Sequence, residues 1–98
     1  MPRIVSIEDS RRKTKRYRVY LEDGSHYDFG LKGGDTYIDH KNKQKRENYR
    51  KRHLGNKIEK HLISHLIPSS SLMSYWILWG PSTDIMKNIN ILNRMWDE

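Results

Sequence analysis

The chain has 98 residues, no cysteine and a formal net charge of +7, from 19 Lys or Arg against 12 Asp or Glu. This length corresponds to a single domain, 1–98, and the lack of cysteine excludes disulfides and thiolate metal sites. No apolar run is long enough for a secretory signal or a membrane span, so we expect a soluble intracellular protein that binds no membrane.

The positive charge is concentrated in the first half of the chain. Residues 1–56 hold 15 Lys or Arg and 8 Asp or Glu, whereas residues 57–98 hold four of each. The second half carries the three tryptophans and most of the large aliphatic residues. This distribution is typical of a cationic binding surface carried by an apolar scaffold.

Residues 1–34 predict a short antiparallel β-meander. Two runs, 3–9 and 16–22, alternate in polarity and are rich in β-branched and aromatic residues, which favours strands. An Asp-Gly dipeptide at 23–24 follows the second run and predicts a hairpin turn. A third strand is expected over 26–29, closed by the glycines that follow it.

Residues 35–98 predict three or four helices. The first is expected to begin with Asp39 as its N-cap and to end before Gly55, because glycine is preferred just past a helix end. The second is expected to start at Asn56, which has the character of an N-cap, and to run to about Ile67.

The apolar residues of the helical part predict which faces are buried. Ile58, Leu62 and Leu66 are spaced i, i+4, i+8 and predict a core stripe on the second helix. Residues 71–79 are apolar nearly all round, so we expect the central buried helix there. A last helix is expected after a cap at Ser82 or Thr83, and its predicted buried face is Ile85, Ile89 and Leu92 with Met95 or Trp96. The sequence therefore predicts an α+β domain, with a short N-terminal antiparallel β-meander followed by three or four helices.

Two basic segments, 11–18 and 41–52, hold thirteen of the nineteen Lys and Arg. Segment 41–52 contains good helix formers but no apolar stripe, so a helix there must face solvent or a ligand. Lys and Arg neutralise phosphates and release counterions, and tyrosines among them can stack on bases. A solvated face without a ligand is the alternative interpretation. The predicted nucleic-acid-binding residues are Lys41, Lys43, Lys45, Arg46, Tyr49, Arg50, Lys51 and Arg52, with Arg11, Arg12, Lys13, Lys15 and Arg16 as a second contact.

Two groups of side chains are weighed for metal or catalytic chemistry. His61 and His65 have the i, i+4 spacing of metal ligands, but a third ligand would have to come from Glu59, His53 or elsewhere, so we favour exposed histidines. A metal nuclease could be built from Asp39, His40, Glu47, Asn48 and His53. We favour structural roles for that group, so we assign no catalytic residue, no metal and no cofactor, and we do not expect an enzyme.

The aromatic segment 75–79, together with Trp96, is interpreted as core, because tryptophan at this density is usually buried. The alternative is a surface that docks a partner or a second copy of the chain. It would make the protein a structural, capsid-associated protein that contacts its neighbours through the Trp-rich helices.

Five sequence blocks occur in a specific order. They are FGLK at 29–32, YIDHK at 37–41, an R-x-x-Y-x-x-RH frame (Arg46, Tyr49, Arg52, His53), SYWILWG at 74–80 and PST at 81–83. Over about residues 29–93 the chain resembles a family of small, largely uncharacterised basic proteins of nucleocytoplasmic large DNA viruses, the giant viruses. The resemblance implies no activity. It implies a viral setting, namely the virion and the host cytoplasm with its virus factory.

Together these observations predict a non-enzymatic protein that binds nucleic acid without sequence preference, DNA rather than RNA. In the viral setting it would help to condense or coat the genome and would be packaged in the virion. A homodimer and contacts with virion neighbours are left open by the sequence.

Overall fold

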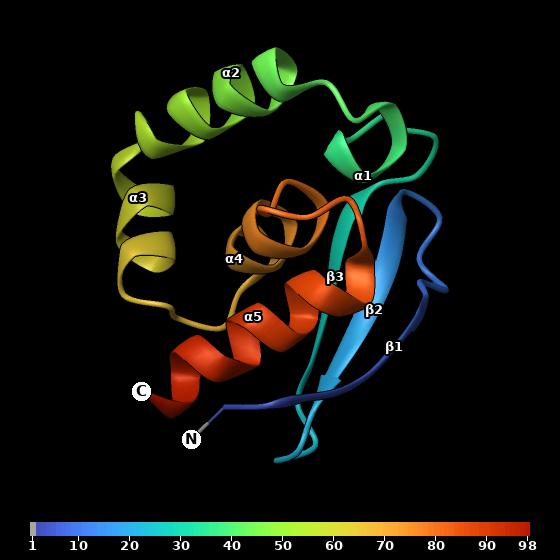
Figure 1. The fold of residues 1–98 in the computed structure, drawn as a ribbon. Helices are drawn as coiled ribbons and strands as arrows, with labels where there is room; N and C mark the ends of the chain where they lie inside the picture. The colour runs from blue at the N-terminus through green and yellow to red at the C-terminus, as the bar shows by residue number, and fades with distance from the viewer. Residues whose placement is uncertain (1) are drawn as a thin grey trace.

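The computed structural model describes residues 2–98 and has the predicted α+β fold (Figure 1). Strands β1 (Ile4–Asp9), β2 (Lys15–Leu21) and β3 (His26–Leu31) form one antiparallel sheet in the order β1-β2-β3. The helical elements are α1 (Tyr37–His40), α2 (Lys43–Leu54), α3 (Lys57–Ser64), α4 (Ser70–Met73), the π-helical η1 (Ser74–Leu78) and α5 (Ile85–Asp97). A β-meander followed by helices confirms the expected fold class.

The sheet follows the alternation of the sequence. Val19 and Leu21 of β2 are buried, and the β2–β3 connection turns at Gly24 with a φ of +90°, as the Asp-Gly dipeptide predicts. In β1 the register shifts between Ile4 and Ser6, so Ile4 is buried while Val5 points outward and is 58% exposed. The sheet therefore has one apolar face, which the helices cover.

Helices α4 and η1 form the centre of the fold, as the apolar run 71–79 predicts. In Figure 1 they lie between the sheet, α5 and the outer pair α2 and α3. Leu72, Met73, Ile77 and Leu78 have no exposed surface. Trp79 and Trp96 join the same core, and Trp96 Nε1 donates a hydrogen bond to the carbonyl of Leu66 at 2.8 Å. No helix within residues 2–98 is both long and apolar enough to cross a bilayer.

Two predicted helix caps are wrong. Thr36 is the N-cap of α1, and Asp39 lies three residues further on, where its carboxylate accepts from the Thr36 N–H at 2.8 Å. Lys41 then takes a left-handed conformation that ends α1, so Asn42 caps α2 instead. Asp84, rather than Ser82 or Thr83, caps α5, because its carboxylate accepts from the N–H groups of the first turn. Helix α2 ends before Gly55, as expected.

The predicted core stripe of the second helix is wrong at Ile58, whereas Leu62 is half-buried and Leu66 packs against the core. Helix α3 ends at Ser64 rather than near Ile67, because Leu66 adopts a left-handed conformation with a φ of +52°. Ile58 lies in the first turn and is 74% exposed, and the buried residue of the helix is Ile63. The i, i+4, i+8 spacing was compatible with a stripe, but the peripheral position of α3 leaves its first turn in solvent.

Candidate nucleic-acid interface

Helix α2 has no fully buried residue, yet one of its faces is fixed to the rest of the fold by polar side chains. Arg46 is half-buried, and its Nε donates to the carbonyl oxygens of Gly80 at 2.8 Å and Trp79 at 3.2 Å. These carbonyls lie just past the end of the central helix, where intrahelical donors are lacking. Arg46 therefore anchors α2, and its guanidinium is engaged within the fold.

Tyr49 lies in the middle of a ladder of four rings. Its ring is parallel to Trp79, with centroids 4.2 Å apart, and its centroid is 4.0 Å from that of His53. Two rings at these distances cannot share one face, so both faces of Tyr49 are covered. His40 extends the ladder from Trp79, with centroids 5.3 Å apart. Tyr49 is therefore not free to stack on a base, in contrast to the sequence-based expectation.

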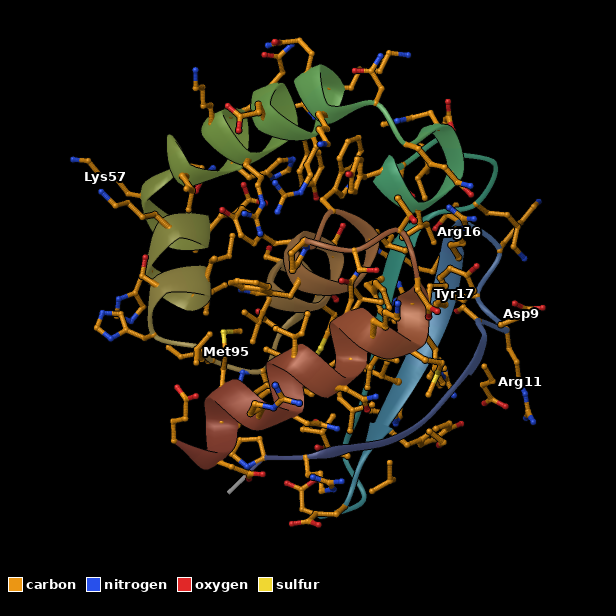
Figure 2. The ribbon with its side chains drawn as sticks, viewed as in Figure 1. Asp9, Arg11, Arg16, Tyr17, Lys57 and Met95 are labelled. Carbon is orange, nitrogen blue, oxygen red and sulfur yellow. The ribbon has the colours of Figure 1, made fainter. Side chains whose placement is uncertain are left out.

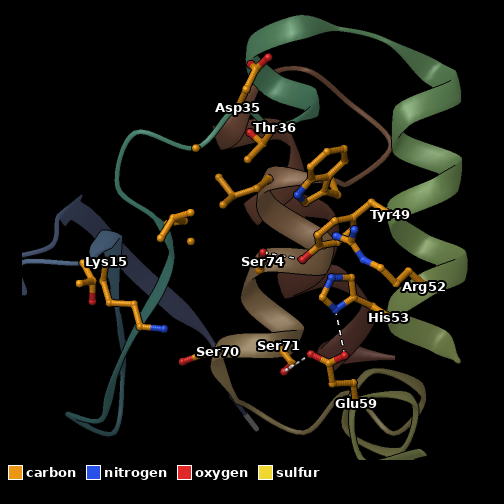
Figure 3. A pocket seen from close by; sticks show the side chains of 16 residues that line it. Lys15, Asp35, Thr36, Tyr49, Arg52, His53, Glu59, Ser70, Ser71 and Ser74 are labelled. Atoms are coloured by element: carbon orange, nitrogen blue, oxygen red, sulfur yellow. Dashed lines mark hydrogen bonds and ion pairs between the residues drawn. The ribbon is translucent and has the colours of Figure 1, made fainter. Parts of the chain in front are cut away.

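The Tyr49 hydroxyl is also engaged. It shares a hydrogen bond of 2.9 Å with Ser74 Oγ of the central helix, and the two side chains face one another in Figure 3. Burial raises the pKa of the Tyr49 phenol, a shift that the hydrogen bond to Ser74 opposes. Tyr49 is thus a packing residue that ties α2 to the core.

Arg50 completes the inward face of α2. Its guanidinium carbon lies 4.3 Å from the ring centroid of Tyr75 and 5.1 Å from that of Trp76. Within residues 2–98 its Nε and Nη2 have no hydrogen-bond acceptor. The guanidinium instead makes cation–π contacts with the two aromatic rings. Burial lowers the pKa of Arg50. The side chain lies under α2 rather than on its outer face.

Arg16, predicted as a second contact, is paired within the fold. Its guanidinium donates two hydrogen bonds to Asp39, both of 2.7 Å, and thereby joins β2 to α1. The hydrogen bonds from Arg16 hold the pKa of the Asp39 carboxyl well below its usual range. Such a bidentate pair is geometrically specific, so Arg16 has a structural role.

The remaining predicted cations lie on the surface of the molecule, apart from the half-buried Lys15. None of them takes part in an ion pair within residues 2–98. Five lie exposed on α2 or just before it, and Glu47 is the one carboxylate in residues 41–54. The loop between β1 and β2 exposes three more, and Figure 2 shows Arg11 pointing away from the molecule. The exposed set is Lys41, Lys43, Lys45, Lys51 and Arg52, with Arg11, Arg12 and Lys13; Lys15 is half-buried.

Sequence reasoning missed cations on α3 that continue this surface. Lys57 and Lys60 are exposed, and Figure 2 shows Lys57 pointing into solvent beside the end of α2. The sequence signal was their position just after the Asn56 cap, on the first turns of a short helix that follows α2 directly. The exposed cations of α2 and α3, together with Lys41 just before α2, are called the outer basic face below. They are Lys41, Lys43, Lys45, Lys51, Arg52, Lys57 and Lys60.

The residues weighed for metal or nuclease chemistry do not assemble into one site among the described residues. His61 and His65 face one another with ring centroids 4.5 Å apart, but no group of three or more potential ligands occurs within residues 2–98. Asp39 pairs with Arg16, and Glu47 and Asn48 lie exposed on α2. His53 Nδ1 instead forms a hydrogen bond of 2.9 Å with Glu59 of α3, which the sequence did not single out for that role.

Comparison with known proteins gives one family. The model of a family of unknown function (DUF5754) matches residues 5–53, which is half of the chain, so the chain belongs to this family. The match covers the sheet, α1 and nearly all of α2. No curated protein and no solved structure matches the chain.

Proposed function

We propose that this member of a family without an assigned function is a non-enzymatic nucleic-acid-binding protein that acts through its outer basic face. One observation carries the proposal, namely that the charges of α2 are divided between its two faces. Arg46 and Arg50 hold the helix to the fold, which leaves five exposed cations without a partner in residues 2–98. Fixing a helix so that its unpaired cations point outward suits a polyanionic ligand.

The composition of this face supports binding without base preference. Four of its five cations on and before α2 are lysines, which act as compact point charges and contact phosphates rather than reading base edges. Affinity then comes from counterion release and falls steeply with salt. The helix of 12 residues spans about 18 Å, a length that can follow several phosphates of a duplex. DNA is proposed over RNA because residues 29–93 resemble proteins of large DNA viruses.

The viral part of the proposal rests on the resemblance of residues 29–93 to basic proteins of large DNA viruses. In that setting the protein would condense or coat the genome in the virion and in the host cytoplasm. The alternative, a structural protein that contacts neighbours through tryptophans, gains little support, because Trp79 and Trp96 are less than a tenth exposed. Trp76 alone is half-buried.

The proposal is tested by fluorescence anisotropy with a labelled long duplex. The variant Lys45→Gln/Lys51→Gln removes two outer cations, and Lys87→Gln/Arg94→Gln is the matched control on the exposed side of α5. In about 0.1 M salt each lost phosphate contact weakens binding about 8-fold, so the first variant should bind about 60-fold more weakly. The affinity of the control variant for the duplex should remain close to that of the wild type. Absent binding at low salt, or an equal loss in both variants, would overturn the proposal.

A further inference from the structure

Strand β1 lies at an edge of the sheet, with β2 on one side and no strand of residues 2–98 on the other. The N–H of Ser10 donates to the carbonyl of Arg16 at 3.1 Å, so the alternation of an antiparallel ladder turns the backbone of Glu8 toward β2 as well. The N–H and C=O groups of Ile7 and Asp9 therefore point away from β2. Backbone groups at an open edge of this kind can pair with an added strand.

Helix α5 already pairs with this edge at one residue. The side-chain amide of Asn93 accepts from the N–H of Ile4 at 2.8 Å and donates to the carbonyl of Ile4 at 3.0 Å, as the backbone of a neighbouring strand would do. The register shift between Ile4 and Ser6 separates this contact from the rest of β1. The edge is thus closed at Ile4, whereas Ile7 and Asp9 remain for another chain.

A groove of about 380 Å³ lies between β1 and α5 beside this edge and is called the edge groove below. Its apolar lining comes from Ile4, Val5 and Ile7 of β1 and from Met86 and Ile89 of α5. Two of these side chains are largely in solvent, Val5 at 58% and Met86 at 55% exposed. An apolar groove next to an open sheet edge suits a segment that pairs with β1 and buries its side chains against α5.

The far end of the open edge is acidic. Glu8 and Asp9 are exposed, and neither takes part in an ion pair within residues 2–98. Figure 2 shows Asp9 at the rim of the molecule. Asp9 and Ile7 are two residues apart in the strand and share one face of the sheet. A strand opposite them therefore presents one side chain to Asp9 and, two residues away, another to Ile7, and charge complementarity makes the first a Lys or Arg.

We propose that the edge groove binds an extended segment of a partner protein with the pattern basic-x-apolar-x-apolar. The segment pairs antiparallel with β1, the pairing that the rest of the sheet has and the more stable one per residue. Its basic residue meets Asp9, its first apolar residue meets Ile7, and its second enters the space lined by Val5 and Met86. Strand β1 lies across the fold from α2 (Figure 1), so the inference does not rest on nucleic-acid binding.

The test is a titration of the full chain with a peptide SKTVTVS, blocked at both ends, followed by amide chemical shifts and hydrogen exchange. The amides of Ile7 and Asp9 should shift, and at a free peptide concentration of about 10 Kd they should exchange about 10-fold more slowly. The control peptide SETVTVS places an acid opposite Asp9 and should bind about 5-fold more weakly. Unchanged amides along β1, or equal binding of the two peptides, would overturn the inference.

Variants of the protein separate the groove from other apolar surface. Met86→Lys places a charge in the edge groove and should weaken the SKTVTVS peptide at least about 10-fold. Ile58→Lys is the matched control, because Ile58 is also largely exposed but lies on α3, and it should bind the peptide as the wild type does. Equal losses in the two variants would count against the edge groove.

A second copy of the chain is the other occupant that the experiment can reveal. If the amides of Ile7 and Asp9 shift with protein concentration in the absence of peptide, and light scattering gives a dimer, the edge belongs to a second copy and the inference is overturned. Peptide binding by a protein that fails to bind duplex DNA would leave this inference standing and refute the proposed function alone.

Discussion

Arg46 and Lys45 are neighbours in the chain, but Arg46 is bonded to the fold whereas Lys45 is exposed, and exchanging each for Gln tests that division. Arg46→Gln removes a half-buried donor from the carbonyls of Trp79 and Gly80. A hydrogen bond to a charged group contributes about 1.5–3 kcal/mol to stability, so we expect a loss of about 2 kcal/mol. Lys45 is exposed, and its replacement should change the free energy of unfolding by less than about 0.5 kcal/mol.

The two variants are a matched pair, because both lose one positive charge and both place Gln in the same helix. Thermal unfolding followed by circular dichroism measures the difference. For a domain of this size 1 kcal/mol corresponds to about 4–8 °C, so Arg46→Gln should lower Tm by about 8–16 °C and Lys45→Gln by a few degrees at most. The two variants should rank in the opposite order in DNA affinity. Near 0.1 M salt Lys45→Gln should bind DNA about 8-fold more weakly than the wild type, and folded Arg46→Gln should lose little affinity. Equal Tm changes in the two variants would refute the division of α2 into two faces.

Two further predictions concern the groups that hold the fold around this helix. Asn88 is fully buried and its amide makes three hydrogen bonds to the backbone, so Asn88→Ala should cost about 3 kcal/mol in a urea titration. Asn90→Ala, at an exposed position, is the control, and a similar loss there would contradict the account. Because Arg16 lowers the pKa of Asp39, their pair stabilises the fold fully above the unfolded carboxyl pKa of about 3.9 and less as the pH falls below it. In the Asp39→Asn variant the free energy of unfolding should therefore fall less steeply below about pH 4 than in the wild type. The same dependence on pH in both proteins would count against the pair.

Much of the fold follows from local patterns in the sequence. Alternation of β-branched and aromatic residues predicted the strands, and the apolar run at 71–79 predicted the central helix. The stripe on α3 was misjudged, because spacing alone does not tell whether a first turn meets a neighbour. Ile58 has the right spacing but lies where α3 faces solvent.

The inward face of α2 was missed for a different reason. Its contact residues Arg46, Tyr49, Arg50 and His53 have helical-face spacing, but their polar side chains are invisible to a search for an apolar stripe. Three of them belong to the R-x-x-Y-x-x-RH frame, so the frame describes how α2 is fixed rather than what it binds.

The groove lined by Lys15, Arg52 and Ser71, among other residues, could not be predicted from the sequence, because its lining is assembled from distant segments. Lys15, Arg52 and Ser71 come from a strand and two different helical regions, and only the packing of those elements brings them to one space. Composition shows that cations are abundant, but not which of them remain unpaired after folding.

The central claim is that the outer basic face binds a polyanion, and the slope of log K against log salt tests it most directly. With about five phosphate contacts the wild-type slope on duplex DNA should be about −4.5. The Lys45→Gln/Lys51→Gln variant should have a slope of about −2.7, and Lys87→Gln/Arg94→Gln should keep the wild-type value. Equal slopes for the wild type and the α2 variant, or a slope near zero for the wild type, would contradict the account.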